Sequence, residues 1–354
     1  MSAAVETRAA RTVHLMVPDK FIAPFVDFVL RHFDANEHRF CLLGAPRSDF
    51  GLRADQPLDW IAGEHDEPRL LQALFAAERI VIHGLWSERV LRLLYALPSL
   101  ARKSHWVIWG GDLYDAQWQA RTPGHEQNEA LRRAVITQLG GAVGLPGDMD
   151  VAHERYGFRG ERLVCFTYPS NLASSAPLAP REPGPLRILV GNSATESNCH
   201  LEVFARLTRH WQPGMEVHCP LAYGDPAYRD LVIANGRGQF GADFHAITTL
   251  MPLADYNAFL GRIDAAVLHH NRQQGLGNAV TLLSLGKKVY ARPEQSHSRQ
   301  LASLGVRLFT LAEFNAEPLD EATRAHNAAL LREHHSEARL VQGLAALFAP
   351  RSTA

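Results

Sequence analysis

A turn of small polar residues follows the apolar stretch 186–190, which has the composition of a buried strand. Gly191 lets the main chain turn sharply and approach a ligand closely. The helical pattern of residues 201–211 begins soon after, so free N–H groups and the positive end of the helix dipole face the turn. The residues of this turn that could hold a phosphate are Gly191, Asn192, Ser193, Thr195, Ser197 and Asn198. An ordinary turn in which serine and asparagine cap the helix is the alternative.

A second turn of this kind follows the apolar stretch 265–268 and precedes a helical pattern at 278–285. Arg272 could clamp a diphosphate with its fork of donors. Gly275 and Gly277 would allow close approach of the backbone. Amide side chains are supplied by Gln273, Gln274 and Asn278. A glycine-rich turn with a solvated arginine is the alternative, but two such turns in the same half of the chain favour phosphate binding.

In the first half, the apolar stretch 106–109 ends at Gly110 and Gly111 and is followed by Asp112. At the end of a parallel strand, this carboxylate would be presented where such sheets bind ligands. It could orient a sugar hydroxyl or accept its proton as a general base. Capping of the next segment is the alternative.

His83 follows the short apolar stretch 80–82 and could act as a second acid or base. A lone histidine is more often a structural residue, and we favour that role. Neither a metal nor another cofactor is predicted, because the histidines lack metal-ligand spacing with carboxylates. Asp148 and Asp150 have the spacing of a metal-binding pair, but they follow a loop in the first half.

Strand-like and helical stretches alternate along the chain, which is typical of a doubly wound, mainly parallel α/β sheet. Residues 169–185, rich in proline, serine and alanine, interrupt the alternation between two Rossmann-like halves that would face a central cleft. We expect domains at 1–172 and 183–335, and a terminal helix at 336–354 that could pack back on the first domain. The predicted strands are 13–17, 40–43, 80–82, 106–109, 142–145, 163–166, 186–190, 216–219, 265–268 and 288–291, and a further short strand is expected near 244–245.

The composition is that of a globular protein with 354 residues, enough for two domains. Its 36 basic and 37 acidic residues give a net charge of −1, so no basic surplus points to nucleic acid. The four cysteines are widely spaced and are typical of reduced core thiols. Since neither a signal peptide nor a membrane-spanning stretch is evident, we expect a cytoplasmic protein.

The stretch 86–103 combines a wide leucine face with four cations and could seat on an anionic membrane. A core helix whose arginines reach out to solvent is the commoner arrangement, and we rank it first. We expect peripheral contact with a membrane only if the protein acts on a lipid-linked molecule.

Three segments together resemble one enzyme family: 106–114 (WVIWGGDLY), 188–193 (ILVGNS) with Ser197 and Asn198, and 272–277 (RQQGLG). They are similar to the bacterial TDP-N-acetylfucosamine:lipid II N-acetylfucosaminyltransferases, glycosyltransferase family 56. Weaker matches occur at His83–Gly84 and at 220–223. The segments occur in the same order over most of the chain.

The resemblance implies a two-domain GT-B architecture and a metal-independent glycosyltransferase that moves an N-acetylfucosamine- or fucose-like deoxy sugar. The donor would be a dTDP-sugar and the acceptor an undecaprenyl-diphosphate-linked saccharide of enterobacterial common antigen synthesis, used at the cytoplasmic face of the inner membrane. Residues 191–198 would hold the donor diphosphate, 272–278 would contact phosphate or donor sugar, and Tyr223 would lie near the nucleotide. Arg272 and two helix N-termini would stabilise the departing diphosphate. On the acceptor side the implied residues are Gly110, Gly111, Asp112 and Tyr114. Asp112 would be the base if the reaction inverts the anomeric centre, and it could only orient the acceptor if configuration is retained.

Other functions stay open at this point. A nucleotide-sugar 2-epimerase of GT-B-like architecture would use the same phosphate sites without an acceptor. A binding module would sense a nucleotide sugar without turnover. Because the first 80 residues and the helix after Asp112 match the family poorly, a transferase that acts on another glycan or on a protein is a further alternative.

Overall fold

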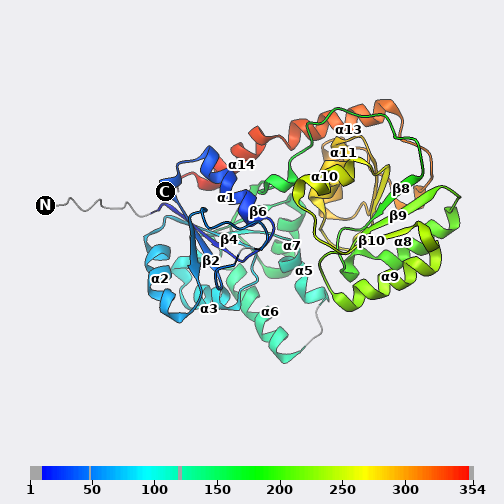
Figure 1. The fold of residues 1–354 in the computed structure, drawn as a ribbon. Coiled ribbons are helices and arrows are strands. Elements are labelled where there is room, and N and C mark those ends of the chain that lie inside the picture. The colour runs from blue at the N-terminus through cyan, green and yellow to red at the C-terminus, as the bar shows by residue number, and fades with distance from the viewer. Residues whose placement is uncertain (1–9, 48, 119–121, 351–354) are drawn as a thin grey trace. The chain divides into compact units, whose positions relative to one another are not determined.

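The computed structural model describes residues 10–47, 49–118 and 122–350. The chain divides into two compact units, Met1–Ser170 with Leu340–Ala354, and Asn171–Arg339 (Figure 1). Each unit contains one sheet, and every strand pair in both sheets is parallel. The doubly wound α/β class predicted from the alternation of strands and helices is confirmed.

The first unit is built on seven strands in the order β3-β2-β1-β4-β5-β6-β7. These strands are β1 (Thr12–Met16), β2 (His38–Leu43), β3 (Leu58–Ile61), β4 (Arg79–His83), β5 (Ser104–Val107), β6 (Gly141–Gly144) and β7 (Glu161–Val164). The sequence does not predict β3. It is a four-residue edge strand with three residues only half-buried, so it lacks the apolar run that marks an inner strand.

The first unit has helices on both faces of its sheet, and its last helix comes from the end of the chain (Figure 1). They are α1 (Ile22–His32), α2 (Glu67–Ala76), α3 (Glu88–Ala96), α4 (Pro98–Ala101), α5 (Gly111–Trp118), α6 (Pro123–Ile136), α7 (Pro146–Tyr156) and α14 (Glu337–Phe348). Arg11 Nη2 donates to the carbonyl of Phe348 at 2.8 Å, and Arg79 Nη2 donates to that of Ala349 at 3.1 Å. Two arginines thus satisfy carbonyl groups at the end of α14 that have no partner within the helix.

The second unit is built on five strands in the order β10-β9-β8-β11-β12. The strands are β8 (Leu186–Val190), β9 (Met215–Pro220), β10 (Phe244–Ile247), β11 (Ala265–Leu268) and β12 (Lys288–Ala291). The helices are α8 (His200–Leu207), α9 (Pro226–Phe240), α10 (Leu253–Gly261), α11 (Leu276–Ser284), α12 (Ser296–Ser303) and α13 (Glu321–His334). Residues 188–190 of β8 are all fully buried, as expected of a strand covered on both faces.

The strand order of the second unit reverses between β8 and β11. From β8 the chain proceeds to β9 and β10 on one side, and it then returns to β11 and β12 on the other. In open parallel sheets, ligands bind outside the carboxyl ends of the strands at such a reversal. The turns after β8 and β11 are the two that the sequence predicts to bind phosphate.

The proline-rich segment between the two series of strands is held against the second unit. Arg332 Nε donates to the carbonyl of Ser174 at 3.1 Å, and Arg324 Nη2 donates to that of Ala179 at 2.7 Å. The segment forms no strand or helix between residues 172 and 185, so these arginines supply donors that regular structure would otherwise provide.

The stretch 86–103 forms α3 and α4 of the first unit. Val90, Leu91 and Leu94 of α3 are buried in the core, and Arg89 Nε donates to Glu67 Oε1 at 2.9 Å. This arrangement is the core helix that we ranked first. Among the described residues, no helix combines the length and the apolar character needed to cross a membrane.

Candidate functional site

The turn after β8 can be formed only with glycine at its first position. Gly191 has a φ of +70°, which side-chain-bearing residues rarely adopt. A Cβ atom there would lie 2.6 Å from His200 Nε2 and 2.8 Å from Asn198 Oδ1. The glycine therefore lets the turn lie directly on the residues that begin α8.

Asn198 gives the turn its shape. Its Oδ1 accepts from the Asn192 N–H at 2.8 Å, while its Nδ2 donates to Thr195 Oγ1 at 2.8 Å and to Ser193 Oγ at 3.1 Å. Asn198 is fully buried, and Ser193 and Ser197 are nearly so. Several residues predicted to touch a phosphate are thus buried inside the turn, where their side chains hold its backbone in position.

The two predicted turns meet and form one site. Ser197 Oγ donates to Gln274 Oε1 at 2.6 Å, and Gln274 Nε2 donates to Asn192 Oδ1 at 3.0 Å. The main chains join as well, since Asn271 N–H donates to the carbonyl of Ser197 at 3.0 Å. Tyr223, which is 41% exposed, accepts from Asn192 Nδ2 at 3.3 Å. The structure therefore brings together the residues that the sequence predicts after β8, β9 and β11.

Four helices of this unit follow the carboxyl ends of its strands without a side-chain cap. Their N-caps are Cys199 for α8, Pro252 for α10, Gly275 for α11 and Gln295 for α12. The first N–H groups of a helix have no acceptor within it, so these helix ends can bind an anion. Gly277 lies in the first turn of α11, and Gly275 has a φ of +72°.

The longer polar side chains of the second turn lie next to the start of α11. Arg272 Nη1 donates to the carbonyl of Gln273 at 3.1 Å, and both side chains are half-buried. Asn278 Nδ2 donates to Tyr256 Oη at 2.9 Å. Arg272 thus places a permanent positive charge beside an uncapped helix N-terminus, the combination that binds phosphates.

Sequence reasoning missed the polar residues at the start of α12 and behind the second turn. Both ring nitrogens of His297, Ser298 Oγ and His270 Nε2 are buried without a hydrogen-bond partner in the protein. Burial lowers the pKa of His297 to about 4, so the ring is neutral at physiological pH. Buried polar atoms without protein partners indicate a place for water or ligand atoms. A signal was available, because the sequence QSHS directly follows the loop after a predicted strand.

Asp112 is not presented to a ligand, and this part of the prediction is wrong. The residue is fully buried. Its Oδ2 accepts from the Leu85 N–H at 2.8 Å and from Trp106 Nε1 at 2.6 Å, while its Oδ1 accepts from the Trp109 N–H at 3.0 Å. Burial raises the pKa of the carboxyl, and these three N–H groups oppose the rise. Asp112 therefore joins the turns after β4 and β5 by hydrogen bonds. This structural role is similar to the capping role given above as the alternative.

We predict that Asp112→Asn destabilises the first unit by about 3 kcal/mol, because an amide cannot accept at both positions and would turn its NH₂ group toward a buried donor. Urea unfolding followed by tryptophan fluorescence measures this loss, since five of the six tryptophans lie between residues 60 and 118. Asp55→Asn, at a side chain that is 75% exposed, is the matched control. Full stability with abolished turnover would instead make Asp112 a catalytic base.

His83 belongs to a buried chain of hydrogen bonds and is not an acid or base at a surface. Trp109 Nε1 donates to Tyr168 Oη at 2.6 Å, and Tyr168 Oη lies 2.8 Å from His83 Nδ1. His83 Nε2 is 3.2 Å from His14 Nδ1, and His14 Nε2 is 3.0 Å from His38 Nδ1. Burial lowers the pKa of His83 to about 3. The structural role that we favoured agrees with these contacts.

The remaining predicted acceptor residues lie in packed surroundings. A Cβ on Gly111 would lie 2.7 Å from the Trp86 ring. The absence of a side chain at Gly111 therefore makes room for the Trp86 indole and not for a ligand. Gly110 has a φ of +80° and makes the turn itself. Tyr114 is almost fully buried and its hydroxyl donates to Asp148 Oδ1 at 3.2 Å. The structure contradicts the predicted acceptor contact of Tyr114, because its polar atom faces the core.

The family model of 4-alpha-L-fucosyltransferases, glycosyl transferase group 56, matches residues 70–330, well over half of the chain. The chain belongs to glycosyltransferase group 56. This assignment confirms the resemblance carried by residues 106–114, 188–198 and 272–277, and it makes the protein a glycosyltransferase. It also favours transfer over the isomerase and sensor alternatives.

Solved structures of glycosyltransferases share the fold of this group 56 chain. HepE from Anabaena in complex with UDP and glucose has 10% sequence identity and a TM-score of 0.69, over 95% of this chain and 98% of that chain. WaaG, a glycosyltransferase involved in lipopolysaccharide biosynthesis, has 11% identity and a TM-score of 0.63, over 96% of this chain and all of that chain. α,α-Trehalose 6-phosphate synthase from Burkholderia multivorans has 10% identity and a TM-score of 0.62, over 96% of each. The predicted GT-B fold is thereby confirmed.

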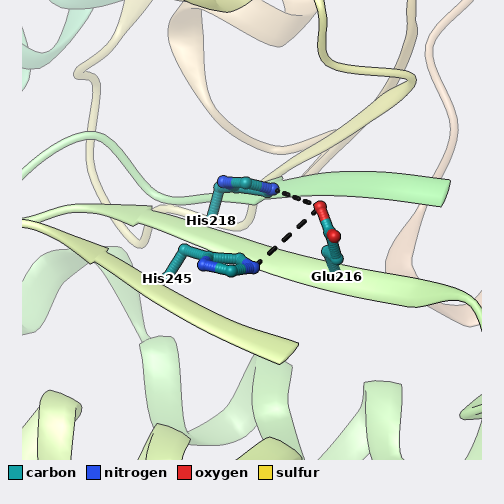
Figure 2. A group of neighbouring side chains, drawn as sticks. All are labelled: Glu216, His218 and His245. Carbon is teal, nitrogen blue, oxygen red and sulfur yellow. Dashed lines mark hydrogen bonds and ion pairs between the residues drawn. The ribbon is translucent and has the colours of Figure 1, made fainter. Parts of the chain in front are cut away.

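The group 56 chain also brings together side chains that could hold a metal ion. Within the described residues these are Glu216 and His218 of β9 and His245 of β10 (Figure 2). They precede the carboxyl ends of their strands, which lead to the polar turns described above. The statement that the histidines lack metal-ligand spacing with carboxylates is therefore wrong for Glu216 and His218, which are two residues apart on a strand.

Proposed function

We propose that this glycosyltransferase moves an N-acetylfucosamine- or fucose-like deoxy sugar from a dTDP-sugar to a glycan carried on undecaprenyl diphosphate. The donor diphosphate would lie between the turn at 191–198 and the turn at 272–278. The observation that carries this proposal is the pair of hydrogen bonds that Gln274 makes to Ser197 and Asn192, beside the uncapped start of α11. These bonds join the two turns, so that their polar groups could hold one anion.

In the reaction, a hydroxyl oxygen of the acceptor forms a bond to the anomeric carbon of the donor sugar. The bond from that carbon to the diphosphate oxygen breaks, and the nucleoside diphosphate leaves with the electron pair. Arg272 and the N-termini of α8 and α11 would stabilise the charge that builds up on the diphosphate, without a metal ion at that position. The hydroxyl proton must pass to a base, and Asp112 is not available for this step while its oxygens accept three internal N–H groups.

We further propose that the enzyme works at the cytoplasmic face of the inner membrane, in synthesis of a surface polysaccharide like the enterobacterial common antigen. The family resemblance supports this acceptor, since it covers segments from both units of the chain. The shared fold with WaaG, which takes part in lipopolysaccharide biosynthesis, is in line with it. Tyr223 would contact the nucleotide, because it is exposed and joined to the phosphate turn.

A thermal-shift panel of dTDP, UDP, GDP and ADP, without and with magnesium, tests the donor. We expect dTDP alone to raise the Tm, to the same extent in both conditions, because ligands that bind only the folded state stabilise it. UDP is the main competitor in the panel, since HepE structures contain it. A larger rise in Tm with UDP or GDP would contradict the proposed dTDP-sugar donor but not the family assignment. No rise in Tm with any nucleotide would contradict the proposed phosphate site.

A further inference from the structure

Figure 2 shows two imidazole rings from adjacent strands aimed at one carboxylate. Glu216 Oε2 lies 3.2 Å from His218 Nε2 and 3.9 Å from His245 Nε2. All three ligand atoms lie within 4.8 Å of one another. The two rings are stacked, with centroids 4.6 Å apart and an angle of 21° between their planes.

The sheet itself produces this convergence. Side chains two residues apart on a strand point to the same face, so Glu216 and His218 lie on one side of β9. In the parallel pairing of β9 with β10, His245 is the direct partner of His218. The opposite face of β9 carries Val217 and Cys219, which belong to the hydrophobic core. The three polar side chains are therefore fixed by strand register and not by a flexible loop.

Two of the three separations between ligand atoms are close to those of a small tetrahedral site. Bonds of about 2.0–2.1 Å from Zn²⁺ to nitrogen and oxygen separate neighbouring ligand atoms by roughly 3.3 Å in a tetrahedron. The 3.2 Å separation is already of this size, and rotation of the His245 side chain would shorten both its 3.9 Å separation from Glu216 Oε2 and its separation from His218 Nε2, which is within 4.8 Å. His245 Nε2 is buried, has no hydrogen-bond partner in the protein and is aimed at the carboxylate. Such an atom needs a partner that hydrogen bonds within the protein do not supply.

The surroundings of the cluster are mixed. The ring of Phe259 in α10 lies 5.9 Å from that of His218 and partly shields it from water. Arg187 Nε lies 3.8 Å from Glu216 Oε2 and competes for that carboxylate, but Arg187 also pairs with Glu182 at 3.2 Å.

We propose that Glu216, His218 and His245 bind one Zn²⁺ ion, with a water molecule in the fourth position. Two imidazoles and one carboxylate form a ligand set that suits Zn²⁺, whereas Mg²⁺ and Ca²⁺ prefer oxygen ligands throughout. The ion would tie the edge strand β10 to β9, whose carboxyl end leads to Tyr223 and the phosphate turn. Its role is structural, and it is independent of the proposed donor.

The test uses the full chain after removal of metals with a chelator, titrated with Zn²⁺ by calorimetry and with Co²⁺ by visible spectroscopy. We expect one Zn²⁺ per chain, a rise in Tm, and the intense Co²⁺ bands of a four-coordinate site. His245→Ala and Glu216→Gln should each weaken Zn²⁺ binding at least tenfold. His326→Ala, an exposed histidine of the same unit, should leave it unchanged. Urea unfolding of the metal-free variants shows that each one folds.

Three results would overturn the proposal. The first is Zn²⁺ affinity in the unsubstituted chain no higher than in His245→Ala. The second is an equal loss of Zn²⁺ affinity in the His326→Ala control, which would mean that scattered surface histidines bind the ion. The third is displacement of Zn²⁺ by an equal concentration of Mg²⁺, which would mean a site of another ligand type. None of these results bears on nucleotide binding, so the proposed donor is tested separately.

Discussion

Replacing Arg272 by alanine is expected to lower the turnover number for sugar transfer by about 10²–10³-fold, the usual effect of removing one group that stabilises developing charge. The guanidinium lies beside the uncapped start of α11, where the leaving diphosphate is proposed to bind. Arg272→Lys should give an intermediate rate, because lysine keeps the charge but loses the fork of donors. Initial rates with saturating donor and acceptor measure the effect, and the dTDP-induced rise in Tm should shrink in parallel.

The matched control for Arg272 is Arg262→Ala. Arg262 is an exposed arginine at the end of α10 in the same unit, and its removal should leave the rate within about twofold because it has no part in the site. Turnover of Arg272→Ala within threefold of the unsubstituted enzyme would remove Arg272 from the mechanism. The charge on the diphosphate would then have to be stabilised by the helix N-termini or by an added metal ion.

Acidification from pH 7.5 to pH 5.5 is expected to destabilise the first unit strongly, through His14, His38 and His83. Burial lowers the pKa of His83 to about 3 and that of His38 to about 4, and it lowers the pKa of His14 as well. At pH 5.5 the folded state keeps these rings neutral, while the unfolded chain binds protons near pH 6.5. Stability therefore falls as the pH drops below about 6.5. Each ring contributes about 1.4 kcal/mol, or about 4 kcal/mol together.

The variant His38→Asn isolates one of these contributions. The Asn amide offers both an acceptor and a donor, so it can replace His38 Nδ1 as the partner of His14 Nε2, but it does not titrate. The loss between the two pH values, measured by urea unfolding with tryptophan fluorescence, should shrink by about 1.4 kcal/mol. His65→Asn, at a side chain that is 80% exposed, should not change it. An unchanged loss in His38→Asn would show that other groups govern the acid response, such as buried His105, whose pKa is also lowered by burial.

Most of the fold could be predicted because its signals are local. The inner strands of both sheets carry short apolar runs such as 188–190, which parallel sheets bury on both faces. The polar turns that follow them contain glycine where the chain must bend, and Gly191 and Gly275 do adopt positive φ. Strand β3 escaped prediction because its residues are half-buried at the edge of a sheet.

By itself, the sequence determined the fold class, the family and the positions of the two polar turns, since these depend on local patterns and on their order along the chain. Only the tertiary structure decided what individual side chains contact. Ser197 meets Gln274 across 77 residues, and Glu216 meets His245 through the register of β9 with β10. Asp112 has the residue type and position of a catalytic base, yet it is a buried acceptor of three N–H groups. The physical reason is that sheet register and packing set the environment of a polar group, and environment determines its protonation and its role.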